Sequence, residues 1–176
     1  MSATSHYPAA PVAEKIETHT LSVIVDNEPG VLARVIGLFS GRGYNIDSLT
    51  VSETEHARHL SRITIVTTGT PAVIEQIKAQ LGRLVPVHGV HDLTVEGPSV
   101  QRELALIKVA GTGERRVEAM RTADIFRARA VDTTLESFVF EITGAPEKVD
   151  AFIALMRPLG LVDVARTGVA AIARGA

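Results

Sequence analysis

The sequence contains no cysteine and no tryptophan among its 176 residues, and aromatic residues make up only 4% of it. The lack of cysteine excludes disulfides, thiolate zinc sites and a cysteine nucleophile, and it fits a reducing cytoplasm. With so few rings, the core must consist mainly of Val, Ile, Leu and Ala. A formal net charge of −2 at pH 7 gives no electrostatic reason to expect nucleic acid or anionic lipid as a partner.

Long apolar runs and targeting signals are also lacking. No apolar run reaches the ~18 residues that would suggest a membrane-spanning helix. Residues 1–17 have no basic region followed by an apolar stretch, unlike a secretory signal. They also lack arginine and include Glu14 and Glu17, unlike an organellar transit peptide. We therefore expect a mobile N-terminal tail over residues 1–18 and a cytoplasmic location.

The first half of the chain predicts strands and helices in alternation. Leu21, Val23 and Val25 recur at every second position, the period of a half-buried strand over 20–26. After DNEPG, apolar residues follow at helical spacing until Gly43, a typical helix end. These helical positions are Val31, Leu32, Val35, Leu38 and Phe39. Further strands are expected at 45–52, 60–68 and about 85–95, and a second helix at 71–81.

The segment EGPSVQ at 96–101 reads as a linker, after which the same order repeats. Strands are expected at 104–109, 130–134, 138–143 and 161–173, the last as one strand or a pair. Helices are expected at 114–127 and 146–159. Their apolar residues are Val117, Met120, Ile125 and Phe126 in the first helix, and Val149, Phe152, Ile153 and Met156 in the second.

We therefore predict an α+β protein with two tandem ferredoxin-like βαββαβ domains, at residues 19–95 and 102–176. Each would have a four-stranded antiparallel sheet with its helices on one face. The opposite face of each sheet would stay uncovered. Burial of such a face against a second copy is a direct reason to expect a homodimer.

An RNA-binding module is one function compatible with this fold, because a βαββαβ unit hosts unrelated functions. Such a module stacks bases on aromatic side chains of its central strands. Phe138 and Phe140 fall on one face of a predicted strand, but the neighbouring strand LALIKV has no aromatic residue. The alternative interpretation is two phenylalanines of the core.

An enzyme of the acylphosphatase type is a second alternative. Neither half has a phosphate-cradling loop with an arginine after its first strand, and no G-x-S-x-G, Walker loop or H-E-x-x-H occurs. The turn GTGE at 111–114 could hold an anion or simply join a strand to a helix. The pairs His56/His59 and His88/His91 have a spacing that a metal could use, but we interpret them as surface residues. We predict no catalytic residue and no metal site.

A small-molecule sensor is the third possibility, and the turn DNEPGVL at 26–32 favours it. The first N–H groups of a helix have no internal partner and carry the positive end of its dipole. Since Gly30 has no Cβ, a carboxylate can approach the N–H groups of residues 30–32. Asn27 and Asn45 could add polar contacts to an amino acid. Equally, Asn27 and Gly30 could have no role beyond forming the turn, and Asn45 none beyond capping a strand.

A family resemblance adds to these patterns. NEPGVLARVIGLFSGRGYNIDSLTV at 27–51 and SRITIVTTG at 61–69 resemble the ACT domain of acetohydroxyacid (acetolactate) synthase regulatory subunits. The second half agrees at RELALIKV (102–109), IFRARAVD (125–132), EITGAPEKVDAFIALMRPLG (141–160) and RTGVAAIARG (166–175). The resemblance covers residues 19–175 in register.

The resemblance implies a regulatory subunit without catalytic activity of its own. Its ACT domains would dimerise edge to edge and bind valine, or a related branched-chain amino acid, at their interface. The catalytic subunit would be a separate chain that holds thiamine diphosphate, FAD and Mg²⁺, whereas this chain would hold no cofactor. Carried over by position, the effector site comprises Asn27, Gly30, Val31 and Leu32 of one chain with Asn45 and Ile46 of its partner. A free-standing ACT-type amino-acid sensor is the alternative.

Overall fold

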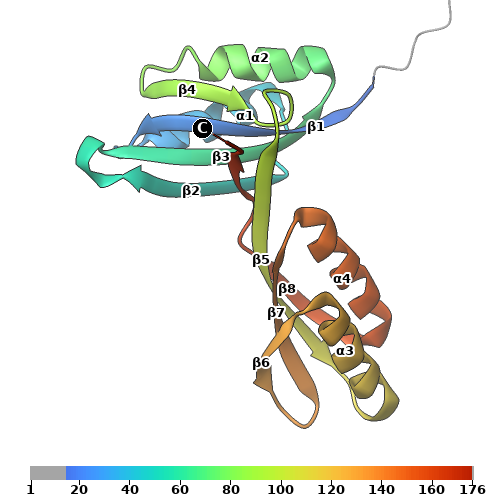
Figure 1. The fold of residues 1–176 in the computed structure, drawn as a ribbon. Helices are drawn as coiled ribbons and strands as arrows, with labels where there is room; N and C mark the ends of the chain where they lie inside the picture. Colours follow the sequence, from blue (N-terminus) through green and yellow to red (C-terminus); the bar gives the residue numbers. More distant parts are fainter. Residues whose placement is uncertain (1–14, 176) are drawn as a thin grey trace, which may run out of the picture.

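The computed structural model describes residues 15–175, which form two α+β units joined by a shared strand (Figure 1). The predicted element order is confirmed in both units. The first unit contains β1 Glu17–Asp26, α1 Val31–Arg42, β2 Ser48–Glu55, a 3₁₀ turn His56–Arg58, β3 Leu60–Gly69, α2 Pro71–Leu81 and β4 Val87–Asp92. The second contains β5 Ser99–Ala110, α3 Gly113–Phe126, β6 Arg129–Thr133, β7 Ser137–Gly144, α4 Pro146–Gly160, β8 Leu161–Arg166 and β9 Ala170–Ala173.

The first sheet is antiparallel in the order β2-β3-β1-β4. The alternating residues Leu21, Val23 and Val25 of β1 are at most 2% exposed. They form one core with the apolar side of both helices, including Val35, Phe39, Ile77 and Leu81. The period-2 pattern therefore predicted the core-facing residues of β1 correctly, but the strand is not half-buried, since Thr20 and Ser22 on its other face are each 4% exposed.

Helix α1 begins and ends at glycines with positive φ. Gly30, its N-cap, has φ 88°, and Gly43, its C-cap, has φ 69°. At the C-terminal end, the N–H of Tyr44 donates to the carbonyl of Phe39 at 3.0 Å. Left-handed backbone at a C-cap favours glycine, so the predicted helix end at Gly43 is confirmed.

The second sheet has the order β6-β7-β5-β8, with β9 also paired to β5. The expected apolar face of α4 is confirmed, because Val149, Phe152, Ile153 and Met156 are all buried. The expected face of α3 is partly wrong. Val117 is 52% and Ile125 78% exposed, whereas Ala119 and Ala123 are buried. Small alanines let this helix lie close to the sheet, so the large aliphatic residues were misleading.

Strand β5 belongs to both units. Its Ser99–Arg102 part pairs with β9 in a two-stranded ribbon, and its later part pairs with β7 and β8. Figure 1 shows β5 running from the first sheet into the second unit, and the C-terminal strand returning to the first. The predicted linker at 96–101 thus overlaps the start of β5, and the expected final pair is β8 and β9.

The ribbon covers part of the first sheet on the face opposite its helices. Val66 of β3 packs there against Val169 and Ala171, which are 4% and 7% exposed, and against Leu93. The expectation of an uncovered face is therefore wrong for this part of the first sheet. The reason is a contact between β3 and residues near the C-terminus, which lie far apart in the sequence, so that no local pattern encodes it.

Two features concern the termini and the membrane. Of the predicted tail, residues 1–14 lie outside the described residues, and Glu17 and Thr18 belong to β1. Within residues 15–175, no helix is long and apolar enough to cross a bilayer.

Candidate functional site

The turn between β1 and α1 presents an open helix start. The N–H of Asn27 donates to the carbonyl of His59 at 2.6 Å, which fixes the beginning of the turn against the β2–β3 connection. No side chain caps the N-terminus of α1, and its first turn contains no acidic residue. The N–H of Val31 donates to the carbonyl of Glu28 at 3.3 Å, so a carboxylate would meet the N–H groups that follow Val31 and the positive end of the dipole.

Gly30 leaves the space in front of this helix start empty. A Cβ built on Gly30 would meet no atom within 4 Å. Asn27 and Leu32 are exposed beside it, whereas Val31 is 5% exposed and belongs to the first core. The structure therefore brings together Asn27, Gly30 and Leu32 in one accessible corner, with the side chain of Val31 buried behind it.

The other predicted site residues lie at the opposite end of α1. Asn45 is exposed, and its amide donates to Oδ1 of Asp47, while its carbonyl accepts from Oγ1 of Thr67 at 2.6 Å. Ile46 is half-buried against the first core. The 12-residue helix between the two groups is roughly 18 Å long. A single chain does not unite them.

Residues 167–169, between β8 and β9, contact β2 of the first unit. We call this segment the latch. The N–H of Val169 donates to Oγ of Ser48 at 2.9 Å, and Oγ1 of Thr50 donates to the carbonyl of Val169 at 2.8 Å. Gly168 makes this approach possible. It has φ 84°, and a Cβ there would lie 2.8 Å from Oγ of Ser48.

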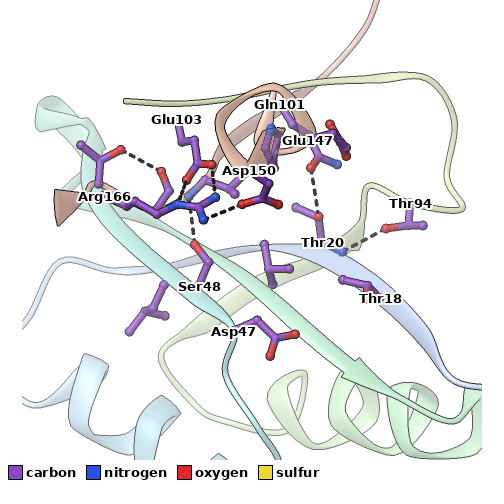
Figure 2. Close-up of a pocket in the computed structure, with 16 residues that line it drawn as sticks. Thr18, Thr20, Asp47, Ser48, Thr94, Gln101, Glu103, Glu147, Asp150 and Arg166 are labelled. Atoms are coloured by element: carbon purple, nitrogen blue, oxygen red, sulfur yellow. Dashed lines mark hydrogen bonds and ion pairs between the residues drawn. The ribbon is translucent and has the colours of Figure 1, made fainter. Parts of the chain in front are cut away.

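Beside the latch, a polar cleft of about 750 Å³ separates the two units (Figure 2). On the second unit's side of the cleft, Arg166 donates to both carboxylate oxygens of Glu103, with Nε to Oε2 at 3.0 Å, and to Oδ1 of Asp150 at 2.7 Å. Hydrogen bonding to the 4% exposed Glu103, helped by Asp150, raises the pKa of Arg166 above its usual value. Across the cleft, Oγ1 of Thr20 donates to Oε1 of Gln101 at 3.4 Å.

Sequence reasoning missed the latch and this ion-pair cluster. Glu103 and Arg166 are far apart in the chain and are brought together because Ala105 of β5 pairs with Arg166 of β8. The charged residue Glu103, at the start of the mostly apolar strand pattern, was the one available signal. The cluster anchors β8 to β5 and so holds the latch residues that follow.

The residues behind the alternative functions have structural roles. Phe138 and Phe140 are 6% and 0% exposed in the second core, so they offer no stacking surface. His88 bonds to Asp26 at 2.6 Å and His91 to Glu96 at 3.2 Å. Across residues 15–175 no three His, Cys, Asp or Glu side chains are grouped to hold a metal ion.

Two family models match the chain, one in each unit. Residues 21–89 match the model described as the AHAS small subunit-like ACT domain. Residues 102–175 match the model described as the small subunit of acetolactate synthase.

Whole-length relatives agree. The probable acetolactate synthase small subunit of Archaeoglobus fulgidus is 50% identical over 157 residues, which cover 89% of this chain and 97% of that protein. The acetolactate synthase small subunit of Mycolicibacterium smegmatis is 45% identical, with 90% and 92% covered. The solved acetolactate synthase small subunit from Thermotoga maritima has a TM-score of 0.80 at 40% identity, with 91% and 99% covered.

Proposed function

The chain belongs to the acetolactate synthase small subunits, the regulatory and non-catalytic subunits of that enzyme, and from this premise we propose that it binds valine or a related branched-chain amino acid and confers feedback inhibition. Membership implies a separate catalytic large subunit and a role in controlling branched-chain amino acid biosynthesis. We further propose that this chain raises the activity of that subunit in the cytoplasm. Thiamine diphosphate, FAD and Mg²⁺ would be held by the catalytic subunit.

The observation that carries the effector proposal is the uncapped start of α1. The ligand carboxylate would accept from the N–H groups after Gly30, where no side chain competes and no Cβ intrudes. The ligand's aliphatic part would lie against Leu32, which is 37% exposed at the same corner. Its ammonium group would find the polar side chain of Asn27.

Asn45 and Ile46 would complete the pocket from a second copy of the chain. They directly precede β2, which is an edge strand of the first sheet. Pairing of two copies at that edge would bring each copy's Asn45 close to the interface, and would remove an unpaired strand edge. The length of α1 supports this arrangement, because it keeps the two groups apart within one chain.

Regulation also requires that the ligand bind two states of the holoenzyme unequally, typically by ~1–3 kcal/mol. We propose that the first-unit dimer interface is the element with two arrangements, since the ligand would touch both chains there. The latch on Ser48 and Thr50 would carry the change to the second unit, because it follows Asn45 by a few residues.

Reconstitution with a catalytic large subunit tests the proposed function. The purified chain alone should form no acetolactate, even with the three cofactors, and should raise the turnover of the catalytic subunit severalfold. Valine, leucine and isoleucine are then titrated separately, and at least one should reverse that activation. Binding of an amino acid without any effect on a catalytic subunit would instead indicate a free-standing sensor.

A further inference from the structure

A second hollow lies where the ribbon meets the first sheet, away from the proposed effector turn. It has a volume of about 480 Å³, within the range typical of small-molecule sites. Its floor is the face of β2 and β3 opposite the helices, and its wall is the ribbon of β5 and β9. The lining residues are Thr50, Ser52, Thr54, Arg62, Thr64, Val100, Arg102, Ala170, Ala171 and Ile172.

Every polar side chain that lines this hollow can donate a hydrogen bond, and its charges are of one sign. Arg62 and Arg102 line it together with hydroxyl side chains, and no lining residue is an Asp, Glu or His. Register explains the grouping, because Ser52 of β2 lies opposite Arg62 of β3, and Thr50 opposite Thr64. The guanidinium groups come from the two different units.

Neither arginine has a counter-ion among the side chains that the structure describes. Arg102 donates through Nη1 only to the carbonyl of Gln101, at 2.7 Å. Arg62 makes no ion pair with any of those side chains, and its Nε is buried without a hydrogen-bond partner among them. A buried donor without an acceptor destabilises the fold, and such a group calls for an explanation. Two unpaired positive charges on one hollow add mutual repulsion.

We propose that this hollow binds a small oxyanion, carried as a phosphate or a carboxylate, between Arg62 and Arg102. The planar guanidinium group matches both anions in a two-pronged geometry, and the hydroxyls of Ser52 and Thr54 supply further donors. The anion offsets the positive charge that the protein leaves unpaired. Because it contacts β3 on one side and β5 on the other, its occupancy holds the ribbon against the first sheet.

Thermal unfolding in phosphate, sulfate, acetate or chloride at matched ionic strength tests the site. Phosphate and sulfate also stabilise proteins in general by exclusion from their surface, so the comparison is made between variants. Arg83→Gln is the control, because Arg83 is an exposed arginine that follows α2. This variant should show the same rise in Tm with phosphate or acetate as the unmodified chain. In Arg62→Gln and Arg102→Gln the apparent affinity for that anion should fall by at least about tenfold.

Amide chemical shifts localise the binding and separate the two anion classes. Phosphate or acetate, whichever binds, should move the amide signals of Ser52 and Ala170 in the unmodified chain, and not in Arg102→Gln. Arg102 is exposed on the ribbon, so this variant remains informative if Arg62→Gln does not fold. Equal Tm shifts in all four proteins, or no shift in either amide, would overturn the site. The proposed effector site is measured separately, by valine binding, and does not depend on this result.

Discussion

At the scale of single residues, Gly30 has two separable properties. Its φ of 88° disfavours any side chain, and the space around it would nevertheless accept one, because nothing lies within 4 Å of the position that a Cβ would take. A substitution at Gly30 would therefore strain the backbone but cause no steric clash. This separation makes Gly30 a suitable position for testing the effector proposal.

Gly30→Asp should abolish valine inhibition while the chain still folds and activates its catalytic partner. The new carboxylate would occupy the place of the ligand's own carboxylate at the start of α1 and repel it. The backbone strain should cost about 1 kcal/mol, since Asp tolerates the left-handed region better than most residues. Inhibition curves of the reconstituted enzyme measure the effect.

Gly113→Asp is the matched control for this substitution. Gly113 also stands at the start of a helix with positive φ, at 59°, and has nothing within 4 Å of its Cβ position. It should cost similar stability and leave inhibition unchanged. Undiminished sensitivity to valine in Gly30→Asp would show that the effector site is elsewhere.

Sequence patterns identified some residues of the candidate site and missed others for a physical reason. The open corner at Gly30 follows from the local sequence DNEPGVL, because helix starts and glycine turns are encoded within a few residues. Glu103 and Arg166 are 63 positions apart in the sequence, and only the pairing of β5 with β8 brings them together. Long-range register of this kind leaves no mark in a short window.

At the scale of elements, β2 lies between the candidate effector residues and the latch to the second unit. The candidate residues Asn45 and Ile46 precede it, and Ser48 and Thr50 within it hold the latch. Any displacement of the start of β2 therefore acts directly on Val169. A side chain larger than hydrogen at Gly168 would push the latch away from β2 and break its hydrogen bonds to Ser48 and Thr50.

Gly168→Ala should disconnect the latch and leave both cores intact. The new methyl group would lie 2.8 Å from Oγ of Ser48 and 3.0 Å from Cγ2 of Thr50, in a backbone conformation with φ 84°. We expect a loss of about 1–2 kcal/mol and weaker activation of the catalytic subunit. Hydrogen exchange of the Val169 amide should become faster, because its acceptor moves away.

The control for this change is Gly175→Ala. Gly175 has almost the same φ, 83°, but nothing lies within 4 Å of its Cβ position. Activation should be unaffected there. If Gly168→Ala also activated normally while its Val169 amide exchanged faster, the latch would have no part in regulation.

The ribbon illustrates what element-level patterns can and cannot predict. A strand was predicted over residues 104–109, and β5 does cover that part. Its first residues, after Pro98, looked like a linker because their partner β9 lies at the other end of the chain. Similarly, Ala119 and Ala123 of α3 carry no strong apolar signal, although they form the contact with the core.

At the scale of the whole molecule, the proposed effector site would need two chains to bring its two groups of residues together. Asn27–Leu32 and Asn45–Ile46 lie at opposite ends of α1, so a complete pocket would combine one group from each copy. A dimer would then hold two equivalent pockets. This arrangement predicts complementation between defective chains.

Mixed dimers of Gly30→Asp and Asn45→Ala chains should regain one valine site, although neither homodimer binds valine. One pocket of the mixed dimer would carry both defects, and the other would be intact. Calorimetry after unfolding and refolding the two chains together should give about half a site per chain in the mixed dimers. If mixing restored no binding while each homodimer stayed folded and dimeric, all of the ligand contacts would come from a single chain.

Strand β5 has a further consequence for how the length of the chain can vary. Its residues up to Arg102 pair with β9, and those from Glu103 pair with β7. Side chains alternate between faces along a strand, so inserting or deleting one residue near this boundary would rotate everything downstream by half a turn. Ile107 and Val109 would then point to solvent, and Lys108 into the second core. Length changes are compatible with the fold around Gly97, ahead of Pro98, whose carbonyl accepts from the N–H of Arg174 at 2.8 Å and extends the pairing with β9.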